Sequence, residues 1–280
     1  MSERVLYPDE EQRRRIMDFI MAAGQTLLEN GAEVFRVEQT MEIMARSFHL
    51  REFHVYILTN GIFASAGTAE ISEVRNVPVR TTHLGRVAAV NELSRQIAAG
   101  GLTLDEAEAQ LARAQRIPFP NDWVQLVAGL SGAFCFAMIF GGTLRAGLAA
   151  AVAGLAANGY LLLCERLHLP GGFRKITTAS LITLVCLPLC HLLGTEASHA
   201  IIGTLMILTP GIAFTMGIRD FVQGDYLSGT IRMIDALLVA ACIAIGTGFC
   251  AVVLFSADGG EHCMSLLTNA TIGTLVVPVF

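Results

Sequence analysis

The sequence predicts an α-helical polytopic membrane protein with an N-terminal cytoplasmic α+β domain. Hydrophobic residues make up 53% of the chain and charged residues 15%, and the mean hydropathy of +0.57 exceeds that of an ordinary soluble domain. The charges are unevenly spread, because only six of the 19 basic and eight of the 24 acidic residues follow Pro118. We therefore expect a cytoplasmic domain over residues 1–118 and a transmembrane domain over residues 119–280.

The start of the chain and its overall composition exclude several classes of protein. Residues 1–15 are charged and lack the continuous apolar core of a cleavable signal, so we expect the N-terminal domain to stay in the cytoplasm. The net charge of −5 argues against a nucleic-acid partner. The seven cysteines follow residue 118 in mostly apolar runs, which favours membrane-helix residues over a disulfide framework. No spacing typical of a metal or cofactor site is evident, so we expect neither.

Two helices are predicted first. Ile16, Ile20 and Leu27 recur at helical spacing and Gly31 can end that helix, which predicts a helix over about 10–30. The second helix has an apolar face opposite a charged one. Its apolar positions are Val34, Val37, Met41, Met44 and Phe48.

A small sheet and two more helices complete the predicted domain. Residues 53–57 alternate in polarity, and Asn60-Gly61 offers a tight turn into a second strand over 62–66. A further strand over about 74–82 contains Pro78, which suits an edge. A helix is expected over 91–99, and the Thr103 to Glu106 capping box predicts another through about 115.

Five apolar segments approach the roughly 20 residues that a helix needs to cross a bilayer. They cover about 122–140, 144–164, 177–193, 199–217 and 233–255. The fourth is broken at Pro210-Gly211. Residues 265–280 are apolar but short, and either lie at the outer interface or form a sixth crossing. Small residues four apart, such as Ala150 with Gly154 and Ala244 with Gly248, predict helix contacts.

Basic residues predict the orientation of these segments. Positively charged short loops are retained on the cytoplasmic side. The second and fourth loops contain Arg166, Arg174, Lys175, Arg219 and Arg232, whereas the opposite loops are flanked by one arginine. We expect a cytoplasmic N-terminus in a bacterial inner membrane.

The charged stretch after the broken segment contains the candidate functional residues. Lipid cannot hydrogen-bond backbone groups released by Pro210 and Gly211, and ionisable groups near membrane segments normally face a cavity or a partner. The candidates for substrate binding or coupling are Pro210, Gly211, Arg219, Asp220, Gly224, Asp225, Arg232 and Asp235. Arg219 and Arg232 could instead be topology anchors. The carboxylates could bind a substrate amine, exchange a proton or hold an arginine that binds a substrate carboxylate.

The run from Pro210-Gly211 through Arg219-Asp220, Gly224-Asp225 and Ser228-Gly229 to Arg232 resembles the signature of the threonine/serine exporter family. Residues 28–38 and 84–91 resemble two blocks of that family's N-terminal half. The family's bacterial two-component relatives include a succinate exporter.

The resemblance implies export of small hydrophilic amino or carboxylic acids, driven by an ion gradient. Candidate substrates are threonine, serine or a dicarboxylate such as succinate. Full-length members are similar to this chain fused to a second membrane half. The resemblance therefore implies one subunit of a split transporter, with a small multi-spanning membrane partner and the lipid bilayer as its surroundings.

A second function remains open at this point. The chain could be a membrane-anchored enzyme or sensor whose active or ligand site lies in the N-terminal domain. His49, His54 and His83 are available there, but no nucleophile elbow, metal-ligand spacing or phosphate loop accompanies them. This favours the transporter, for which we expect no enzymatic activity.

Overall fold

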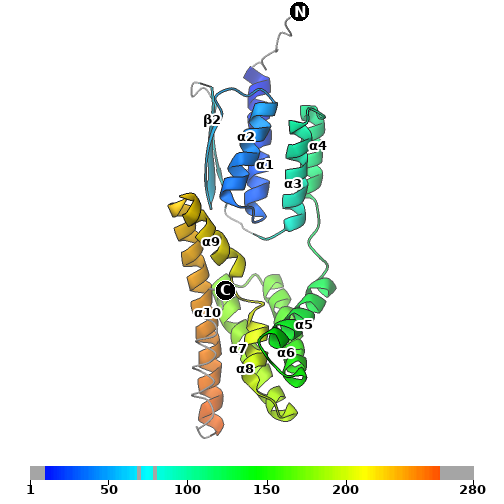
Figure 1. The fold of residues 1–280 in the computed structure, drawn as a ribbon, viewed down its shortest axis with the longest axis vertical. Coiled ribbons are helices and arrows are strands. Elements are labelled where there is room, and N and C mark those ends of the chain that lie inside the picture. The colour runs from blue at the N-terminus through cyan, green and yellow to red at the C-terminus, as the bar shows by residue number, and fades with distance from the viewer. Residues whose placement is uncertain (1–9, 68–70, 78–80, 259–280) are drawn as a thin grey trace, which may run out of the picture. The chain divides into compact units, whose positions relative to one another are not determined.

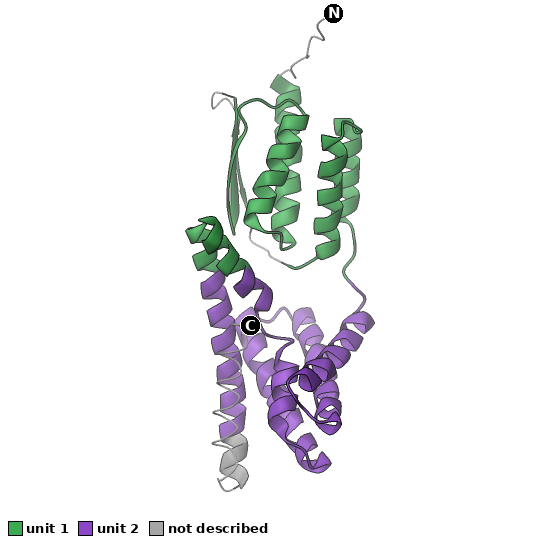
Figure 2. Ribbon diagram, in the orientation of Figure 1, with its two compact units in different colours: residues 1–119, 216–231 green, residues 120–215, 232–280 purple. Residues whose placement is uncertain are grey.

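The computed structural model describes residues 10–67, 71–77 and 81–258. It divides into two compact units (Figure 2). Unit 1 contains residues 1–119 and 216–231, and unit 2 contains residues 120–215 and 232–280.

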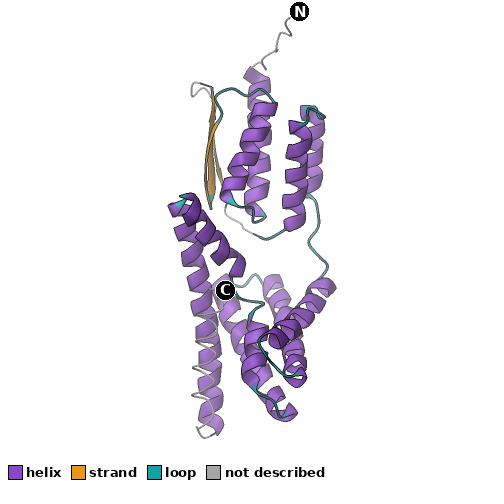
Figure 3. Cartoon of the chain, viewed as in Figure 1, coloured by secondary structure: helices purple, strands orange, loops and turns teal. Residues whose placement is uncertain are grey.

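Unit 1 combines four helices with a three-stranded antiparallel sheet in the order β1-β2-β3 (Figures 1 and 3). Its elements are α1 (Glu10–Glu29), α2 (Val34–Ser47), β1 (His54–Leu58), β2 (Gly61–Ala66), β3 (Ile71–Asn76), α3 (Leu84–Ala98) and α4 (Leu104–Gln115). Helices α1 and α2 lie between the sheet and the α3–α4 pair, so they contribute to contacts on both sides.

The core of unit 1 lies around α1 and α2. Met17, Ile20 and Met41 on these helices are fully buried, together with Ile57 of β1 and Ile62 of β2, which are opposite each other in the sheet. The two helices approach closely, because a Cβ at Gly24 would overlap the Met41 side chain. The predicted amphipathic faces therefore form one shared core.

Local signals placed several of these elements correctly. The hairpin predicted at Asn60-Gly61 is present, but its turn lies one residue earlier, at Thr59-Asn60, because Gly61 is the first residue of β2 and pairs with Leu58. The capping box of α4 is confirmed, because the Glu106 amide donates to Thr103 Oγ1 at 3.4 Å and the Thr103 amide donates to Glu106 Oε2 at 2.9 Å.

Two boundaries in unit 1 were predicted wrongly. Helix α3 begins at Leu84 rather than Asn91, because His83 caps it by accepting the Arg86 amide at 3.2 Å. Strand β3 covers Ile71–Asn76, so it begins and ends earlier than the predicted 74–82. Pro78 lies outside the described residues.

Unit 2 contains the long apolar helices. They are α5 (Asp122–Ile139), α6 (Leu144–Arg166) and α7 (Gly171–Leu193), followed by the short α8 (Ala197–Leu205). Helices α9 (Gly211–Gln223) and α10 (Tyr226–Asp258) each have residues in both units. Within the described chain, four helical segments are long and apolar enough to cross a membrane: α5, α6, α7 and residues 226–252 of α10.

The predicted fourth membrane segment, 199–217, is broken before Gly211, as expected, but its two parts are the separate short helices α8 and α9. Helix α8 ends at Leu205, and the Leu208 and Thr209 amides both donate to its carbonyl, at 2.9 and 3.2 Å. The Thr209 hydroxyl donates to the same oxygen at 3.1 Å. Pro210, which lacks an amide and disfavours helix at the preceding residue, follows directly. The expectation of five transmembrane helices is therefore corrected to four candidate spans among the described residues.

The other membrane boundaries differ less. Helix α7 begins at Gly171 rather than 177 and α10 at Tyr226 rather than 233, so charged residues that were assigned to loops form their first turns. Residues 265–280 lie outside the described part, and their crossing remains a prediction.

Small residues form the helix contacts of unit 2. Ala149, Ala150 and Ala153 of α6 are buried, whereas Leu148 and Val152 are about half exposed, as expected where lipid surrounds large side chains. A Cβ at Gly154 would lie 2.6 Å from the Ala133 Cβ of α5. The predicted Ala150–Gly154 contact face is thus confirmed.

On α10 the close contact lies elsewhere than at Gly248. A Cβ at Gly248 has nothing within 4 Å. At Gly246 an added Cβ would lie 2.9 Å from the Ala179 Cβ of α7. The Ser180 hydroxyl of α7 donates to the Gly246 carbonyl at 2.8 Å, so α7 and α10 meet through a glycine that the four-residue spacing did not select.

Gly154→Ala should destabilise unit 2, because the added methyl group cannot fit against α5 without displacing it. Overpacking of this kind costs about 1–3 kcal/mol. Gly132→Ala is the matched control on α5, since a Cβ there meets nothing within 4 Å. The thermal midpoint of the purified chain in detergent should fall for Gly154→Ala only. Equal midpoints for the two variants would contradict the close α5–α6 approach.

Candidate functional site

The turn between α9 and α10 holds several of the predicted site residues. Gly224 has φ 90°, a left-handed conformation that glycine adopts without strain. The Asp225 amide donates to the Asp220 carbonyl at 2.9 Å, which closes the turn. A Cβ at Gly229 would lie 2.8 Å from the Phe221 ring. These glycines allow a tight hairpin, residues 216–231, which belongs to unit 1.

An ion pair joins this hairpin to α2. Arg219 Nη1 lies 2.6 Å from Glu33 Oε1, and Arg36 Nε lies 3.4 Å from Glu33 Oε2. Glu33 is the N-cap residue of α2, with its side chain 19% exposed against 45% for Arg219. Because water screens the charges, a partly exposed ion pair of this kind contributes at most about 1 kcal/mol to stability. The ion pair therefore matters less for stability than for position, because it holds the planar guanidinium of Arg219 beside the Glu33 carboxylate.

Glu38 is the second acidic residue of α2 at this site. Its Oε1 accepts the Ile57 amide at 3.1 Å. Burial raises the pKa of Glu38, and the negative charges of Asp225 and Glu42 raise the pKa further, while the Ile57 hydrogen bond acts against them. Glu38 therefore takes up a proton more readily than an exposed glutamate, a property typical of functional carboxylates.

Asp220 is buried, with 1% of its surface exposed. It lies on α9, next to Arg219 in the sequence, and Ser228 of α10 is also buried at 2%. A buried carboxylate is unfavourable unless polar groups or positive charge compensate for lost water. A buried carboxylate is unusual on a helix whose only role is to connect two segments, which makes Asp220 a candidate for a functional group.

The other four predicted residues lie in unit 2. Pro210 precedes α9, and its carbonyl accepts the Phe214 amide at 3.0 Å in the first turn. Gly211 is the first residue of α9, and a Cβ there has nothing within 4 Å. Arg232 is half-buried and Asp235 is exposed on α10. Asp235 interacts electrostatically with Lys175, near the start of α7.

The structure thus divides the eight candidates. Unit 1 contains Arg219, Asp220, Gly224 and Asp225, while Pro210, Gly211, Arg232 and Asp235 belong to unit 2. The cluster in unit 1, here the α2–hairpin cluster, consists of Glu33, Arg36, Glu38, Arg219, Asp220 and Asp225. It places positive and negative side chains together, so it can bind a carboxylate, an ammonium group or a proton.

Sequence reasoning did not include Glu33, Arg36 and Glu38 among the site residues. The apolar periodicity of α2 placed them on its polar face, where solvent exposure is the ordinary interpretation. The available signal was their position in residues 28–38, one of the blocks that carried the family resemblance. That block and the hairpin lie far apart in the chain, and only the fold shows their contact.

The raised pKa of Glu38 predicts a pH-dependent stability. Its ionised form is disfavoured in the folded chain, so this contribution to stability is present below the ordinary glutamate pKa and is lost as pH rises through the folded pKa. Glu38→Gln should therefore raise the thermal midpoint at pH 8, and its advantage should vanish near pH 4.

Glu92→Gln provides a control of opposite sign. Arg95 lowers the pKa of Glu92 by hydrogen bonding, so this substitution should be slightly destabilising at pH 8 and neutral at low pH. Thermal melts of the purified variants between pH 4 and pH 8 measure the effects of both substitutions. Parallel pH profiles for Glu38→Gln and the unmodified chain would contradict the burial of the Glu38 charge.

Two comparisons with known proteins gave matches. A family model described as "Putative threonine/serine exporter" (ThrE) matches residues 18–254. A protein of Mycobacterium tuberculosis, described as "Probable threonine/serine exporter", is 26% identical over 243 residues, which are 85% of this chain and 46% of that relative. The chain therefore spans about half the length of this curated relative. No solved structure matches this chain.

The family match covers most of the chain, including both partners of the Glu33–Arg219 ion pair. Four described helical segments are also long and apolar enough to cross a membrane. This chain belongs to the threonine/serine exporter family, a family of multi-pass membrane transporters rather than enzymes.

Proposed function

We propose that this chain is a subunit of a secondary transporter that exports small hydrophilic amino or carboxylic acids. The candidate substrates are threonine, serine or a dicarboxylate such as succinate. The observation that carries the proposal is the contact between Arg219 and Glu33, with the buried Asp220 on the same hairpin. A guanidinium can hold a substrate carboxylate in two parallel hydrogen bonds, and neighbouring carboxylates can hold its ammonium group.

The proton gradient is the proposed energy source. Burial and the charge of Asp225 raise the pKa of Glu38, so this site binds protons readily. A substrate ammonium group beside these acids would lower the same pKa, because a nearby positive charge favours the ionised form. Substrate and proton would then weaken each other's binding, by reciprocal linkage. Competition of this kind is what an antiporter requires.

The proposed arrangement in the membrane follows the charge distribution. Residues 1–118 form a cytoplasmic domain and residues 119–280 the transmembrane domain, in a bacterial inner membrane with a cytoplasmic N-terminus. The basic residues Arg166, Arg174 and Lys175 support this orientation. In this arrangement the α2–hairpin cluster lies on the cytoplasmic side, where an exporter collects its substrate.

A second small multi-spanning membrane subunit is proposed to supply the other half of the transporter. Helix α10 is long and apolar enough to cross the membrane, and ionisable residues on such a helix, here Arg232 and Asp235, normally face a cavity or protein rather than lipid. The relative from Mycobacterium tuberculosis is also about twice as long as the matched region. A partner helix facing α10 would form the opposite wall of the transport path.

Asp220→Asn and Asp225→Asn should each reduce efflux of the exported acid at least tenfold, because each removes a negative charge from the α2–hairpin cluster. Loss of one charged hydrogen bond alone costs about 1.5–3 kcal/mol, roughly tenfold or more in rate. The measurement is efflux of threonine, serine and succinate from cells whose chromosomal copy is replaced by each variant.

Asp105→Asn is the matched control, since Asp105 is an exposed residue of α4 that pairs with Arg15. It should export normally, and all three variants should insert into the membrane to the same level. Normal efflux from both Asp220→Asn and Asp225→Asn would refute the proposed role of the cluster.

A charge exchange tests the Glu33–Arg219 contact itself. Glu33→Arg or Arg219→Glu alone should reduce efflux, because each replaces the attraction between Arg219 Nη1 and Glu33 Oε1, which lie 2.6 Å apart, by repulsion between like charges. The double variant restores opposite charges and should recover part of the activity. The same exchange at the exposed Glu42–Arg46 pair should have no effect. If the double variant were no better than the single ones, the ion pair would not be the feature that matters.

A further inference from the structure

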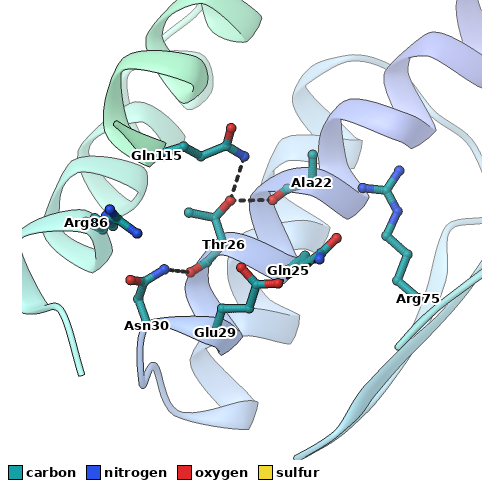
Figure 4. Close-up of a pocket in the computed structure, with 8 residues that line it drawn as sticks. All are labelled: Ala22, Gln25, Thr26, Glu29, Asn30, Arg75, Arg86 and Gln115. Atoms are coloured by element: carbon teal, nitrogen blue, oxygen red, sulfur yellow. Dashed lines mark hydrogen bonds between the residues drawn. The ribbon is translucent and has the colours of Figure 1, made fainter. Parts of the chain in front are cut away.

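Unit 1 contains a polar cavity that the proposed transport site does not use. The cavity measures about 320 Å³, within the usual range of small-molecule sites (Figure 4). It lies among α1, α3, α4 and β3, and the residues that matter for its chemistry are Thr26, Glu29, Asn30, Arg75, Arg86 and Gln115. None of these residues belongs to the α2–hairpin cluster.

Asn30 contributes an acceptor that lacks a donor. Its side chain is buried, with 2% of the residue exposed, and Nδ2 donates to the Thr26 carbonyl at 2.7 Å. Within the described ranges 10–67, 71–77 and 81–258, Oδ1 has no hydrogen-bond partner. A buried carbonyl oxygen without a donor is unfavourable. A ligand that brings an N–H or O–H group would satisfy it.

Arg86 contributes a positive charge that no described carboxylate neutralises. Its Nε and Nη2 donate to the Ile117 carbonyl at 3.0 and 2.8 Å, and its guanidinium lies 5.1 Å from the centre of the Phe119 ring. These neutral partners fix the orientation of the side chain without cancelling its charge. Its remaining donors suit a carboxylate.

Glu29 supplies the opposite charge, four residues before Glu33. Its Oε1 accepts the Gln25 side chain at 2.7 Å, which orients the carboxylate among the lining residues (Figure 4). Arg75, on the other side of the cavity, is paired with Glu73 and Asp18 and is less available to a ligand. The cavity therefore offers one available guanidinium, one carboxylate and one amide oxygen that needs a donor.

We propose that this cavity binds a free α-amino acid. Arg86 holds the carboxylate, while Glu29 and Asn30 Oδ1 accept hydrogen bonds from the ammonium group, with Thr26 and Gln115 beside the side chain. This chemistry discriminates against simple anions and dicarboxylates, which lack a donor for Asn30 and are repelled by Glu29. The site goes beyond the proposed transport site, which it resembles in charge but with which it shares no residue.

The position of the cavity suggests a regulatory role. Glu29 is the last residue of α1, and Asn30 follows it directly. The loop that continues from them ends at Glu33, the residue that pairs with Arg219. An amino acid bound at Glu29 and Asn30 would contact the start of this loop, and through it would influence the position of the Glu33 carboxylate. Binding of an amino acid in the cavity would thus change the geometry of the transport site according to the amino-acid concentration.

Hydrogen–deuterium exchange with L-threonine and L-serine, on the full chain in detergent, tests the proposal because it reports where a ligand binds. Either amino acid should slow amide exchange in residues 29–32 and 81–87. Glu29→Gln retains an acceptor for Gln25 and should still fold. The amino-acid concentration that gives half-maximal protection should nevertheless rise at least tenfold in this variant. Arg86→Gln should do the same, and Arg86→Lys should be intermediate.

The controls separate this site from the transport site. Glu11→Gln, an exposed change on α1, and Asp225→Asn should both retain the protection. Threoninamide, which lacks the carboxylate, N-acetylthreonine, which lacks the ammonium group, and succinate should fail to produce it. The proposal would be overturned if neither amino acid protected these residues, if Glu29→Gln and Arg86→Gln left the protection unchanged, or if succinate or inorganic phosphate protected them equally.

Discussion

The ion pair between Glu33 and Arg219 marks the contact between α2 and the hairpin of residues 216–231, and the proposed transport site depends on that contact. It joins two residues 186 positions apart, one at the start of α2 and the other on the hairpin between α9 and α10. With this contact in place, Asp225 is close enough to Glu38 to raise its pKa. The contact is weak in energy, because water screens it. Under the proposed function, a contact this weak would allow the binding groups to separate and meet again in each transport cycle.

A second constraint acts in unit 2, where membrane helices must associate without the hydrophobic effect. Small residues allow this, since backbones that approach closely gain packing and polar contacts. Gly154 against Ala133 and Gly246 against Ala179 are such places. The Thr204 hydroxyl of α8, which donates to Ala200 and Ala150 carbonyls, shows that polar groups there bond to backbone rather than to lipid.

Local chemistry explains what could be predicted from the sequence. Helical periodicity identified α1 and α2, the Asn60-Gly61 turn identified the β1–β2 hairpin, and Thr103 with Glu106 identified the start of α4. The errors have equally physical causes. His83 caps α3 with a ring nitrogen, which residue type alone does not favour. At the broken segment, bonds to the Leu205 carbonyl end α8 before Pro210. Glu33 was missed because its partner is remote in the chain.

Cross-linking in native membranes tests the central claim, that the hairpin of residues 216–231 packs on α2, most directly. Cysteines replace Glu33 and Arg219 in one variant and Arg46 and Arg219 in a control variant, since Arg46 lies in the last turn of α2. Each variant is treated with a short bismaleimide and digested, and the joined peptides are identified by mass spectrometry. The account predicts a 33–219 cross-link and none, or far less, between 46 and 219. Absence of the first cross-link, or equal yields of the two, would contradict it.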